Sequence, residues 1–469
     1  MNIMVSRSAT QWFVCIFLAG ALILQGCSDG KKDTASGKSA SEKSADLPFL
    51  AETRVLATIG DQEKPANEFI GHNDGAPAQM AGQAVQVTFS DRGNAVAYKA
   101  GHDGKQYVVI NGKAEPPFNT VGDVVFSPDG RKHAYTVKDE NNIWHLKSDA
   151  RSDIFFHHIG MPVFSPDGRH LAFLGSYDDE WFLVIDNKLS AAGKNSYDPY
   201  VFSGDSSKLA YMENSDTDSR RLIIADLDLK TLQVIPSVVS PFAFNADRSK
   251  IAAVVSKDGK QRVVQAAFSR PEVVTEGPAY DEIRAPAFSP DGVSLAYLAR
   301  KGKAIYLVMD GKEELVNSFA MQLIVNPDRK SVGMIQEEAN GVRFRQVFVP
   351  RAVSKLYDEI AEPVYSRDGS QHAFMARKGK NWCAVVNGME GPAFDRVVTP
   401  LFSFDGSRIV YRARKDGKRF VVVADAKGQT IRQHPGYEQV SSPVFSPDGM
   451  SVGYGVKDGN KLVWKVEKL

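Results

Sequence analysis

One short phrase recurs ten times along this chain of 469 residues and constrains its fold more than any other feature. In its clearest copies the phrase is Phe-Ser-Pro-Asp-Gly, and successive copies begin 37 to 44 residues apart. A period near forty residues is typical of repeat architectures in which every repeat is one supersecondary unit. The repeat therefore predicts the architecture, although it does not indicate a ligand. The first residues of the ten copies, called anchors below, are Phe89, Phe126, Phe164, Phe202, Phe244, Phe288, Val325, Tyr365, Phe402 and Phe445.

The phrase predicts a β-hairpin in every repeat. Proline at the second turn position and glycine at the fourth suit a type I turn between two apolar stretches. Nine residues after the anchor stands a second position that is aromatic in eight of the ten repeats, as in Tyr135, Phe173 and Tyr411. Because strand side chains alternate in direction, this fixed offset places both side chains in one layer. Each fully buried aromatic side chain should contribute about 1.5–3 kcal/mol.

Two further strands complete each repeat. A third apolar stretch, such as 181–185 or 420–423, is commonly followed by a turn pair such as Asn111-Gly112. A weaker fourth stretch leads toward the next anchor. Four antiparallel strands per repeat make a propeller blade, so we expect an all-β fold, a β-propeller of about ten four-stranded blades. No apolar stripe of helical period runs through a repeat, which argues against helical solenoids.

The last repeat supplies three strands before the chain stops, and the segment 53–59 ahead of the first repeat could add the missing outer strand. Such pairing would leave no bare sheet edge. It favours one closed ring of ten blades. Two smaller rings remain the alternative, divided in the longest interval, between Phe244 and Phe288.

The amino-terminal residues are typical of a secretory signal. Arg7 precedes an apolar run from Trp12 to Leu24 that contains no acidic residue. About 13 apolar residues are too few to cross roughly 30 Å of hydrocarbon, which disfavours a transmembrane helix. Residues 27–50 are mostly polar or small and cannot form a core, so we expect a flexible tether, and the propeller then spans 51–469.

Two resemblances refine this interpretation. Leu24-Gln25-Gly26-Cys27 looks like the lipobox of bacterial lipoproteins, which implies removal of 1–26 and acylation of Cys27. An ordinary signal peptide is the alternative. Ser28 stands where an aspartate would imply inner-membrane retention, so outer-membrane sorting is favoured. Phe-Ser-Pro-Asp-Gly followed by Leu-Ala-Tyr resembles the WD40-like (PD40) repeats of TolB-type propellers over residues 85–469, which implies a periplasm-facing setting. The amino-terminal α/β domain of TolB has no match.

Charge and cysteine content exclude some functions. Removal of 1–26 takes one arginine and no acid from 57 basic and 56 acidic residues, which leaves no net charge and no indication of nucleic-acid binding. With Cys15 in the signal and Cys27 acylated, Cys383 would be a lone thiol on an apolar strand, more readily explained as inert than as reactive. We find no phosphate-binding loop, Gly-x-Ser-x-Gly turn or His-Glu-x-x-His stretch. We therefore expect no cofactor and no metal.

The turn aspartates form one candidate site. Nine carboxylates on one rim could bind cations or a basic partner, but an aspartate in a tight turn usually accepts hydrogen bonds from its own backbone. We favour this structural role. The residues are Asp129, Asp167, Asp205, Asp247, Asp291, Asp328, Asp368, Asp405 and Asp448.

A second candidate is an aromatic residue followed by an acid, usually eight positions before the next anchor. Exposed aromatic side chains beside carboxylates would form a binding face. The alternative, which we favour of the two, packs each aromatic side chain between blades while the acid binds loop amides. The candidate residues are Tyr197, Asp198, Tyr280, Asp281, Tyr357, Asp358, Phe394, Asp395, Tyr437 and Glu438.

The expected function is a lipid-anchored, non-catalytic scaffold that binds another protein of the cell envelope and meets the membrane only through its lipid. Two alternatives remain: a receptor for glycan or peptidoglycan fragments, and a hydrolase or lyase built from central carboxylates. The histidines do not favour a metal enzyme. His133, His170 and His372 occupy matching repeat positions, and the pair His157-His158 has no third ligand nearby in the sequence.

Overall fold

A computed structural model describes residues 51–59, 64–65, 87–102, 104–149, 155–178, 180–190, 199–214, 220–240, 242–348, 352–446 and 448–469. The regular structure of these residues is β-strand throughout, and every strand pairing is antiparallel. The expected signal and tether, with Cys27, lie outside the described residues. In the described part of the chain no helix is long and apolar enough to cross a membrane.

The strands form ten units, and each unit contains one copy of the repeated phrase. Unit 1 comprises β2 (Lys64–Pro65), β3 (Val87–Phe89), β4 (Val96–His102), β5 (Lys105–Ile110) and β6 (Lys113–Ala114). Unit 2 comprises β7 (Thr120–Val121), β8 (Val125–Phe126), β9 (His133–Lys138), β10 (Trp144–Ser148) and β11 (Phe155–Phe156). Unit 3 comprises β12 (His158–Ile159), β13 (Val163–Phe164), β14 (Leu171–Tyr177), β15 (Glu180–Ile185) and β16 (Lys188–Leu189).

The middle units each contain four strands. Unit 4 comprises β17 (Tyr200–Phe202), β18 (Lys208–Asn214), β19 (Arg220–Asp226) and β20 (Thr231–Val238), and unit 5 comprises β21 (Ala243–Phe244), β22 (Lys250–Lys257), β23 (Lys260–Ala267) and β24 (Arg270–Glu276). Unit 6 comprises β25 (Glu282–Phe288), β26 (Leu295–Lys301), β27 (Ala304–Met309) and β28 (Lys312–Val316). Unit 7 comprises β29 (Ala320–Val325), β30 (Ser331–Glu338), β31 (Gly341–Phe348) and β32 (Ala352–Val353).

The outer strand of the last unit comes from the amino-terminal end of the described chain. Unit 8 comprises β33 (Glu359–Tyr365), β34 (His372–Lys378), β35 (Asn381–Val386) and β36 (Met389–Glu390). Unit 9 comprises β37 (Arg396–Phe402), β38 (Arg408–Lys415), β39 (Lys418–Asp425) and β40 (Thr430–Gln433). Unit 10 comprises β41 (Gln439–Val440), β42 (Val444–Phe445), β43 (Ser451–Asp458) and β44 (Lys461–Lys468), and its outer strand is β1 (Arg54–Thr58).

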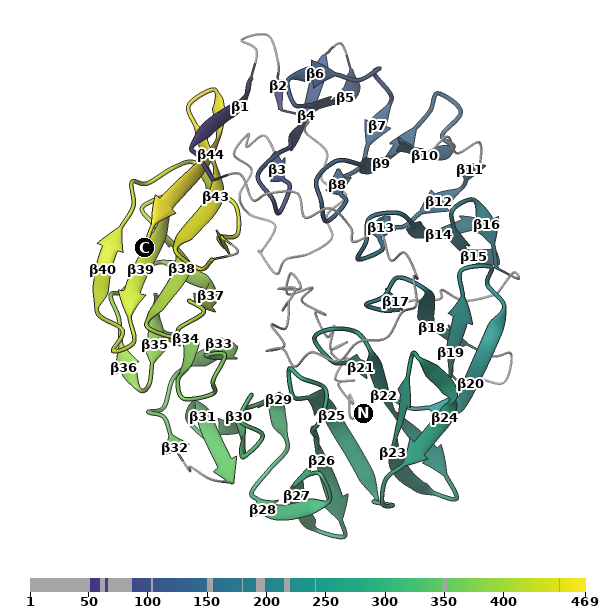
Figure 1. Cartoon of the computed structure of the whole chain (residues 1–469), viewed down its shortest axis with the longest axis vertical. Coiled ribbons are helices and arrows are strands. Elements are labelled where there is room, and N and C mark those ends of the chain that lie inside the picture. Colours follow the sequence, from purple (N-terminus) through teal and green to yellow (C-terminus); the bar gives the residue numbers. More distant parts are fainter. Residues whose placement is uncertain are drawn as a thin grey trace, which may run out of the picture.

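The units follow one another around a common centre in sequence order, with the strand that carries the anchor toward the centre and the opposite edge strand of the sheet at the rim (Figure 1). Units 4 and 5 share one eight-stranded sheet, joined where Val238 pairs with Val255. This radial arrangement of four-stranded antiparallel sheets is a β-propeller, as the repeat predicts.

The hydrophobic core consists of ten clusters, and each cluster lies between two consecutive units. Between units 5 and 6, where the sequence left room for a division, Val254 and Val263 pack with Tyr280 and Tyr297. The remaining junctions have clusters of the same kind, including the junction of unit 10 with unit 1. A unit therefore buries its apolar side chains only together with its two neighbours.

The predicted closing strand is confirmed. β1 pairs with β44, with Val55 opposite Val463 and Ala57 opposite Leu462. Ala57 and Leu462 also contribute to the cluster that joins unit 10 to unit 1. The two ends of the described chain are thereby held in one sheet, and the outer edge of β44 is covered.

Seven of the ten copies of the repeated phrase end in glycine, and at several of these glycines a neighbouring unit approaches closely. Gly369 has a φ of +74°, and a Cβ there would lie 1.9 Å from Oδ1 of Asn326 in the preceding unit. At the junction of units 10 and 1, a Cβ on Gly93 would lie 2.1 Å from the Trp464 indole. Contacts this close, together with positive φ angles, leave only glycine unstrained.

Candidate binding surface

Of the two predictions for the aromatic–acid pairs, the structure agrees with the favoured one, buried side chains, and contradicts the candidate binding face. Tyr280, Tyr357, Phe394 and Tyr437 are between 1% and 9% exposed, so their side chains pack inside the protein. Each bridges through its backbone to the third strand of the preceding unit. This pairing holds each residue against the edge of the preceding blade, so its aromatic side chain is not accessible to a partner. Tyr197 and Asp198 lie outside the described residues.

Two of these tyrosines belong to matching polar networks in units 6 and 8. The hydroxyl of Tyr280 donates to Glu313 Oε1 at 2.7 Å, and that of Tyr357 donates to Glu390 Oε1 at 2.9 Å. A lysine ammonium lies 5.0 Å from the centre of each aromatic ring. Burial and the glutamate contact raise the pKa of both phenols. These repeated contacts hold neighbouring strands together rather than present a site.

The acids that follow the aromatic residues bind loops of the protein itself. Asp281 and Asp358 accept hydrogen bonds from Gly302 N and Gly379 N, both at 2.6 Å, and Asp395 accepts one from Asp416 N at 3.0 Å. In unit 10, Glu438 forms an ion pair with Lys457. These carboxylates therefore satisfy backbone amides and lysines, which is the arrangement expected under the structural alternative.

The turn aspartates likewise bind their own turns. Seven accept a hydrogen bond of 2.5 or 2.6 Å from the serine two residues earlier. Asp247 accepts from Asn245 Nδ2, and Asp328 from Lys330 N. The contact with Ser403 and the amide of Ser407 lowers the pKa of Asp405 to about 2. The seven are Asp129, Asp167, Asp205, Asp291, Asp368, Asp405 and Asp448.

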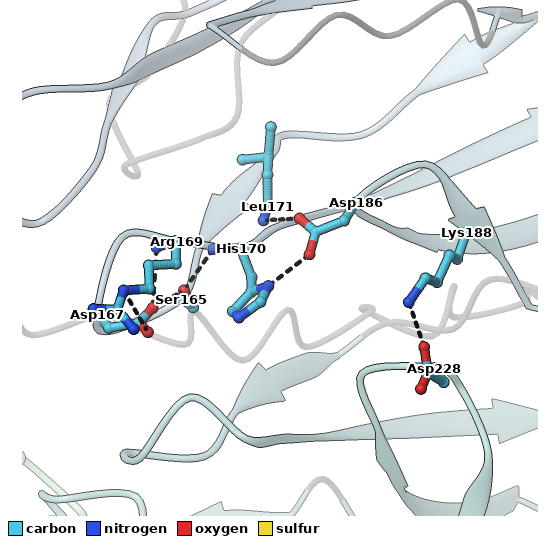
Figure 2. A network of polar contacts seen from close by, with 8 residues as sticks. All are labelled: Ser165, Asp167, Arg169, His170, Leu171, Asp186, Lys188 and Asp228. Carbon is cyan, nitrogen blue, oxygen red and sulfur yellow. Dashed lines mark hydrogen bonds and ion pairs between the residues drawn. The ribbon is translucent and has the colours of Figure 1, made fainter. Parts of the chain in front are cut away.

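A histidine–aspartate pair stands beside one of these turns (Figure 2). His170 Nδ1 lies 2.6 Å from Asp186 Oδ2, a contact that resembles the base and its orienting acid in a hydrolase. The nearby Ser165 is buried, however, and its hydroxyl donates to Asp167 while accepting from the His170 amide. That serine is committed to the turn and is not placed to act as a nucleophile. The neighbouring Lys188–Asp228 ion pair links units 3 and 4.

The one exposed aromatic surface among the described residues spans units 2 and 3. Phe155 and Tyr177 are 50% and 46% exposed, whereas the other exposed large apolar side chains in the described part of the chain are aliphatic or methionine. Their aromatic rings meet edge to face at 6.5 Å. His157 stacks on Tyr177 at 4.4 Å, and His145 lies 6.5 Å from Phe155. We call His145, Phe155, His157 and Tyr177 the aromatic patch.

Neighbouring strands position the aromatic patch. His145 on β10 pairs directly with Phe155 on β11, the outermost strand of unit 2. His157 donates its backbone amide to Ser176 O on β14, and Tyr177 ends that strand. Backbone hydrogen bonds therefore fix side chains from two blades side by side, and one of the strands involved, β11, lies at the outer edge of its unit (Figure 1).

Sequence reasoning missed the aromatic patch because it relied on what the repeats share. Thirteen residues after the anchor, nine units have histidine, aspartate, serine, lysine or glutamate, and only unit 3 has an aromatic residue, Tyr177. Phe155 directly precedes an aromatic–polar pair, whereas the other pairs are preceded by proline, serine, alanine, leucine or glycine. Both residues place an aromatic side chain where the other repeats have none, and this departure was the available signal.

Three other kinds of feature could form a site: a hollow between two units, a cluster of metal ligands and a free thiol. A hollow of about 230 Å³ lies between units 10 and 1, lined by residues that include Asp91, Ser442 and Trp464, and it is smaller than the 300–1,000 Å³ typical of ligand pockets. Within the described residues, no group of three or more His, Cys, Asp or Glu side chains could hold a metal ion. Burial raises the pKa of the partly exposed Cys383 thiol to about 11.

No family model matches the chain, and the curated proteins include no match. Solved structures do match. The eukaryotic initiation factor is 12% identical, over 72% of this chain and 93% of that chain, with a TM-score of 0.44. TolB from Acinetobacter baumannii is 17% identical, over 60% and 79%, with a TM-score of 0.29. The propeller domain of the Trilobed protease from Pyrococcus furiosus is 12% identical, over 56% and 92%, with a TM-score of 0.33. At these values the likenesses carry no argument about activity.

Proposed function

We propose that this protein is a non-catalytic scaffold of the bacterial cell envelope that binds another protein through the aromatic patch. The observation that carries the proposal is the contact between Phe155 and Tyr177, each about half exposed, on adjacent blades. Aromatic side chains are enriched at protein interfaces because they bury a large area and lose few rotatable bonds on binding. The propeller holds them in place before the partner arrives.

In this proposal the scaffold is a single ring of ten blades attached to the membrane through acylated Cys27, with the outer membrane favoured. Support for one ring comes from the ten clusters between consecutive units and from the pairing of β1 with β44. Support for the anchor is the lipobox-like sequence that ends in Gly26-Cys27. A disc on a tether would carry the aromatic patch to partners near the membrane surface.

The non-catalytic assignment rests on how the candidate catalytic groups are used. The turn carboxylates bind their own serines and amides, and the serine nearest His170 is buried in a turn. A glycan receptor working in the central funnel would need aromatic platforms there, whereas Phe155 lies on the outermost strand of its blade. These observations favour a protein partner at the rim over both alternatives.

The test is site-specific photocross-linking of the full-length lipidated protein in bacterial envelopes. A benzophenone amino acid replaces Phe155 in one variant and Leu315, which is 65% exposed on β28 of unit 6, in the control. We expect one discrete cross-linked protein from position 155, none from 315, and loss of the product when Tyr177→Ser is added. Equal labelling from both positions, or no product from 155, would exclude this surface as a docking site.

A further inference from the structure

The aromatic patch lies among acidic side chains. Asp139 Oδ2 is 3.0 Å from His145 Nε2, and Asp178 follows Tyr177 directly. Glu180 is paired with Tyr177 across the β14–β15 hairpin. Glu140, next to Asp139, has a side chain that is 85% exposed. In the described part of the chain, the carboxylates of Asp139, Asp178 and Glu180 therefore belong to residues that contact, follow or pair with members of the aromatic patch.

Two lysines of units 1 and 2 lie near these acids, and both already have contacts. Lys105 Nζ contacts Glu140 at 3.0 Å and Asn119 at 2.8 Å. Lys138 Nζ lies over the Trp144 indole, 5.8 Å from its centre. Neither lysine contacts Asp178 in the described structure, so the negative charge beside Tyr177 is not offset by them.

His157 lies beside Asp178 and leaves its carboxylate accessible. The Nδ1 of His157 accepts a hydrogen bond from the backbone amide of Asp178 at 3.2 Å. The Asp178 carboxylate lies 3.5 Å from the same nitrogen. Its side chain is 75% exposed and directly beside the stacked Tyr177 and His157.

We infer that the partner presents an arginine to this surface, with the guanidinium stacked on the exposed aromatic rings of the aromatic patch and paired with the Asp178 carboxylate. Arginine combines a flat cation that stacks on aromatic faces with a donor fork that matches a carboxylate. An apolar peptide would leave Asp178 uncompensated, and an acidic one would be repelled. This inference rests on the proposed function and specifies the partner's chemistry.

The test uses the full-length lipidated protein in detergent and three labelled peptides of one sequence, whose spaced cationic positions hold arginine, lysine or citrulline. Citrulline keeps the shape of arginine without the charge. We expect the arginine peptide to bind about tenfold more tightly than the citrulline peptide, with affinity falling as salt rises. Asp178→Asn should remove most of this difference.

The matched control is Asp258→Asn, which changes an exposed aspartate at the same repeat position in unit 5. Asp178 and Asp258 have φ angles of 52° and 55°, a conformation that asparagine tolerates well, so both variants should fold. The control should bind the arginine peptide like the unchanged protein. Equal loss in both variants would mean a general charge effect and would overturn the inference.

The outcomes separate this inference from the proposed function. If position 155 cross-links a partner but arginine and citrulline peptides bind alike, the arginine inference is wrong and the scaffold remains. If choline-headgroup vesicles bind in an Asp178-dependent way while the arginine peptide does not, the surface recognises a lipid headgroup instead. A cross-linked partner segment that mass spectrometry shows to lack arginine also overturns the inference. No cross-link at position 155 removes the proposed function itself.

Discussion

At the scale of single residues, His434 is the most unusual side chain in the described core. It is 5% exposed between units 9 and 10, and its Nε2 has no hydrogen-bond partner among the described residues. Its Nδ1 lies 3.7 Å from Glu467 Oε1, and its imidazole lies 5.9 Å from Tyr454. Burial lowers the pKa of His434, and the nearby Glu467 opposes this shift. The neutral form is therefore the one that fits the junction.

This lowered pKa predicts a loss of stability in mild acid. Below about pH 6.5 the unfolded chain binds a proton at His434 while the folded chain still resists it, so the free energy of unfolding falls by at most about 1.4 kcal/mol per pH unit. The loss ends below the folded pKa. Urea unfolding at a series of pH values should show a shallower decline for His434→Gln, and exposed His158→Gln should leave the decline unchanged. An unchanged decline in His434→Gln would remove this explanation.

At the scale of elements, the turn of the repeated phrase works as a small hydrogen-bonded unit. In unit 8, the Ser366 hydroxyl donates to Asp368 at 2.6 Å and accepts the Gln371 amide at 3.0 Å. Ser370, on the surface of the same turn, donates only to Asp368, at 2.9 Å. The buried serine therefore fixes both arms of the hairpin, whereas the exposed one only adds a bond to the aspartate.

Removal of one oxygen from each serine should distinguish the two roles. Ser366→Ala leaves a buried amide and an aspartate without their partner, and we expect a loss of about 1–3 kcal/mol in the free energy of unfolding. Ser370→Ala should change it by less than about 0.5 kcal/mol, because its site is exposed. Equilibrium urea unfolding measures both, and equal losses would contradict the assigned roles.

Much of the element-level structure could be predicted because the turn chemistry is local. Proline or glycine at fixed spacing marks most of the hairpins, and the anchors, nearly all aromatic, indicate the shared layer by their constant offset. Burial of Tyr280 is the favoured of the two predictions from the sequence, whereas the exposure of Tyr177 could not be predicted in the same way. Side chains of units 5 and 6 cover Tyr280. The neighbours of Tyr177 come from outside its own unit: Phe155 lies on β11 of unit 2, and His157 lies between units 2 and 3. Such contacts depend on packing between blades, which a repeat pattern does not encode.

At the scale of the whole molecule, one short strand connects the end of the repeat array to its beginning. Ala57 of β1 is 8% exposed and packs with Leu462, Val96 and Tyr98, whereas Val55 of the same strand is 50% exposed. The closing strand was predictable because an unpaired outer edge on the last unit required a partner. Its register, with a shift between Val55 and Ala57, was not.

The buried and exposed positions of β1 give a direct test of closure. Ala57→Arg forces a long charged side chain into the cluster between units 10 and 1, and we expect a loss of about 3 kcal/mol or more. Val55→Arg, on the exposed side, should stay within about 0.5 kcal/mol. Hydrogen exchange should show faster opening of β44 in Ala57→Arg, and unchanged protection there would mean that β1 does not hold the two ends together.

The pairing of β1 with β44 also has a consequence for the order in which the protein matures. β1 is made some four hundred residues before β44, so the closing strand stays unpaired until β44 has been synthesised. Contacts this distant in sequence form slowly because a very long loop must close first. The earliest blades also lack a neighbour on one side until that moment. Pairing of β1 with β44 is therefore expected to be a late step in folding.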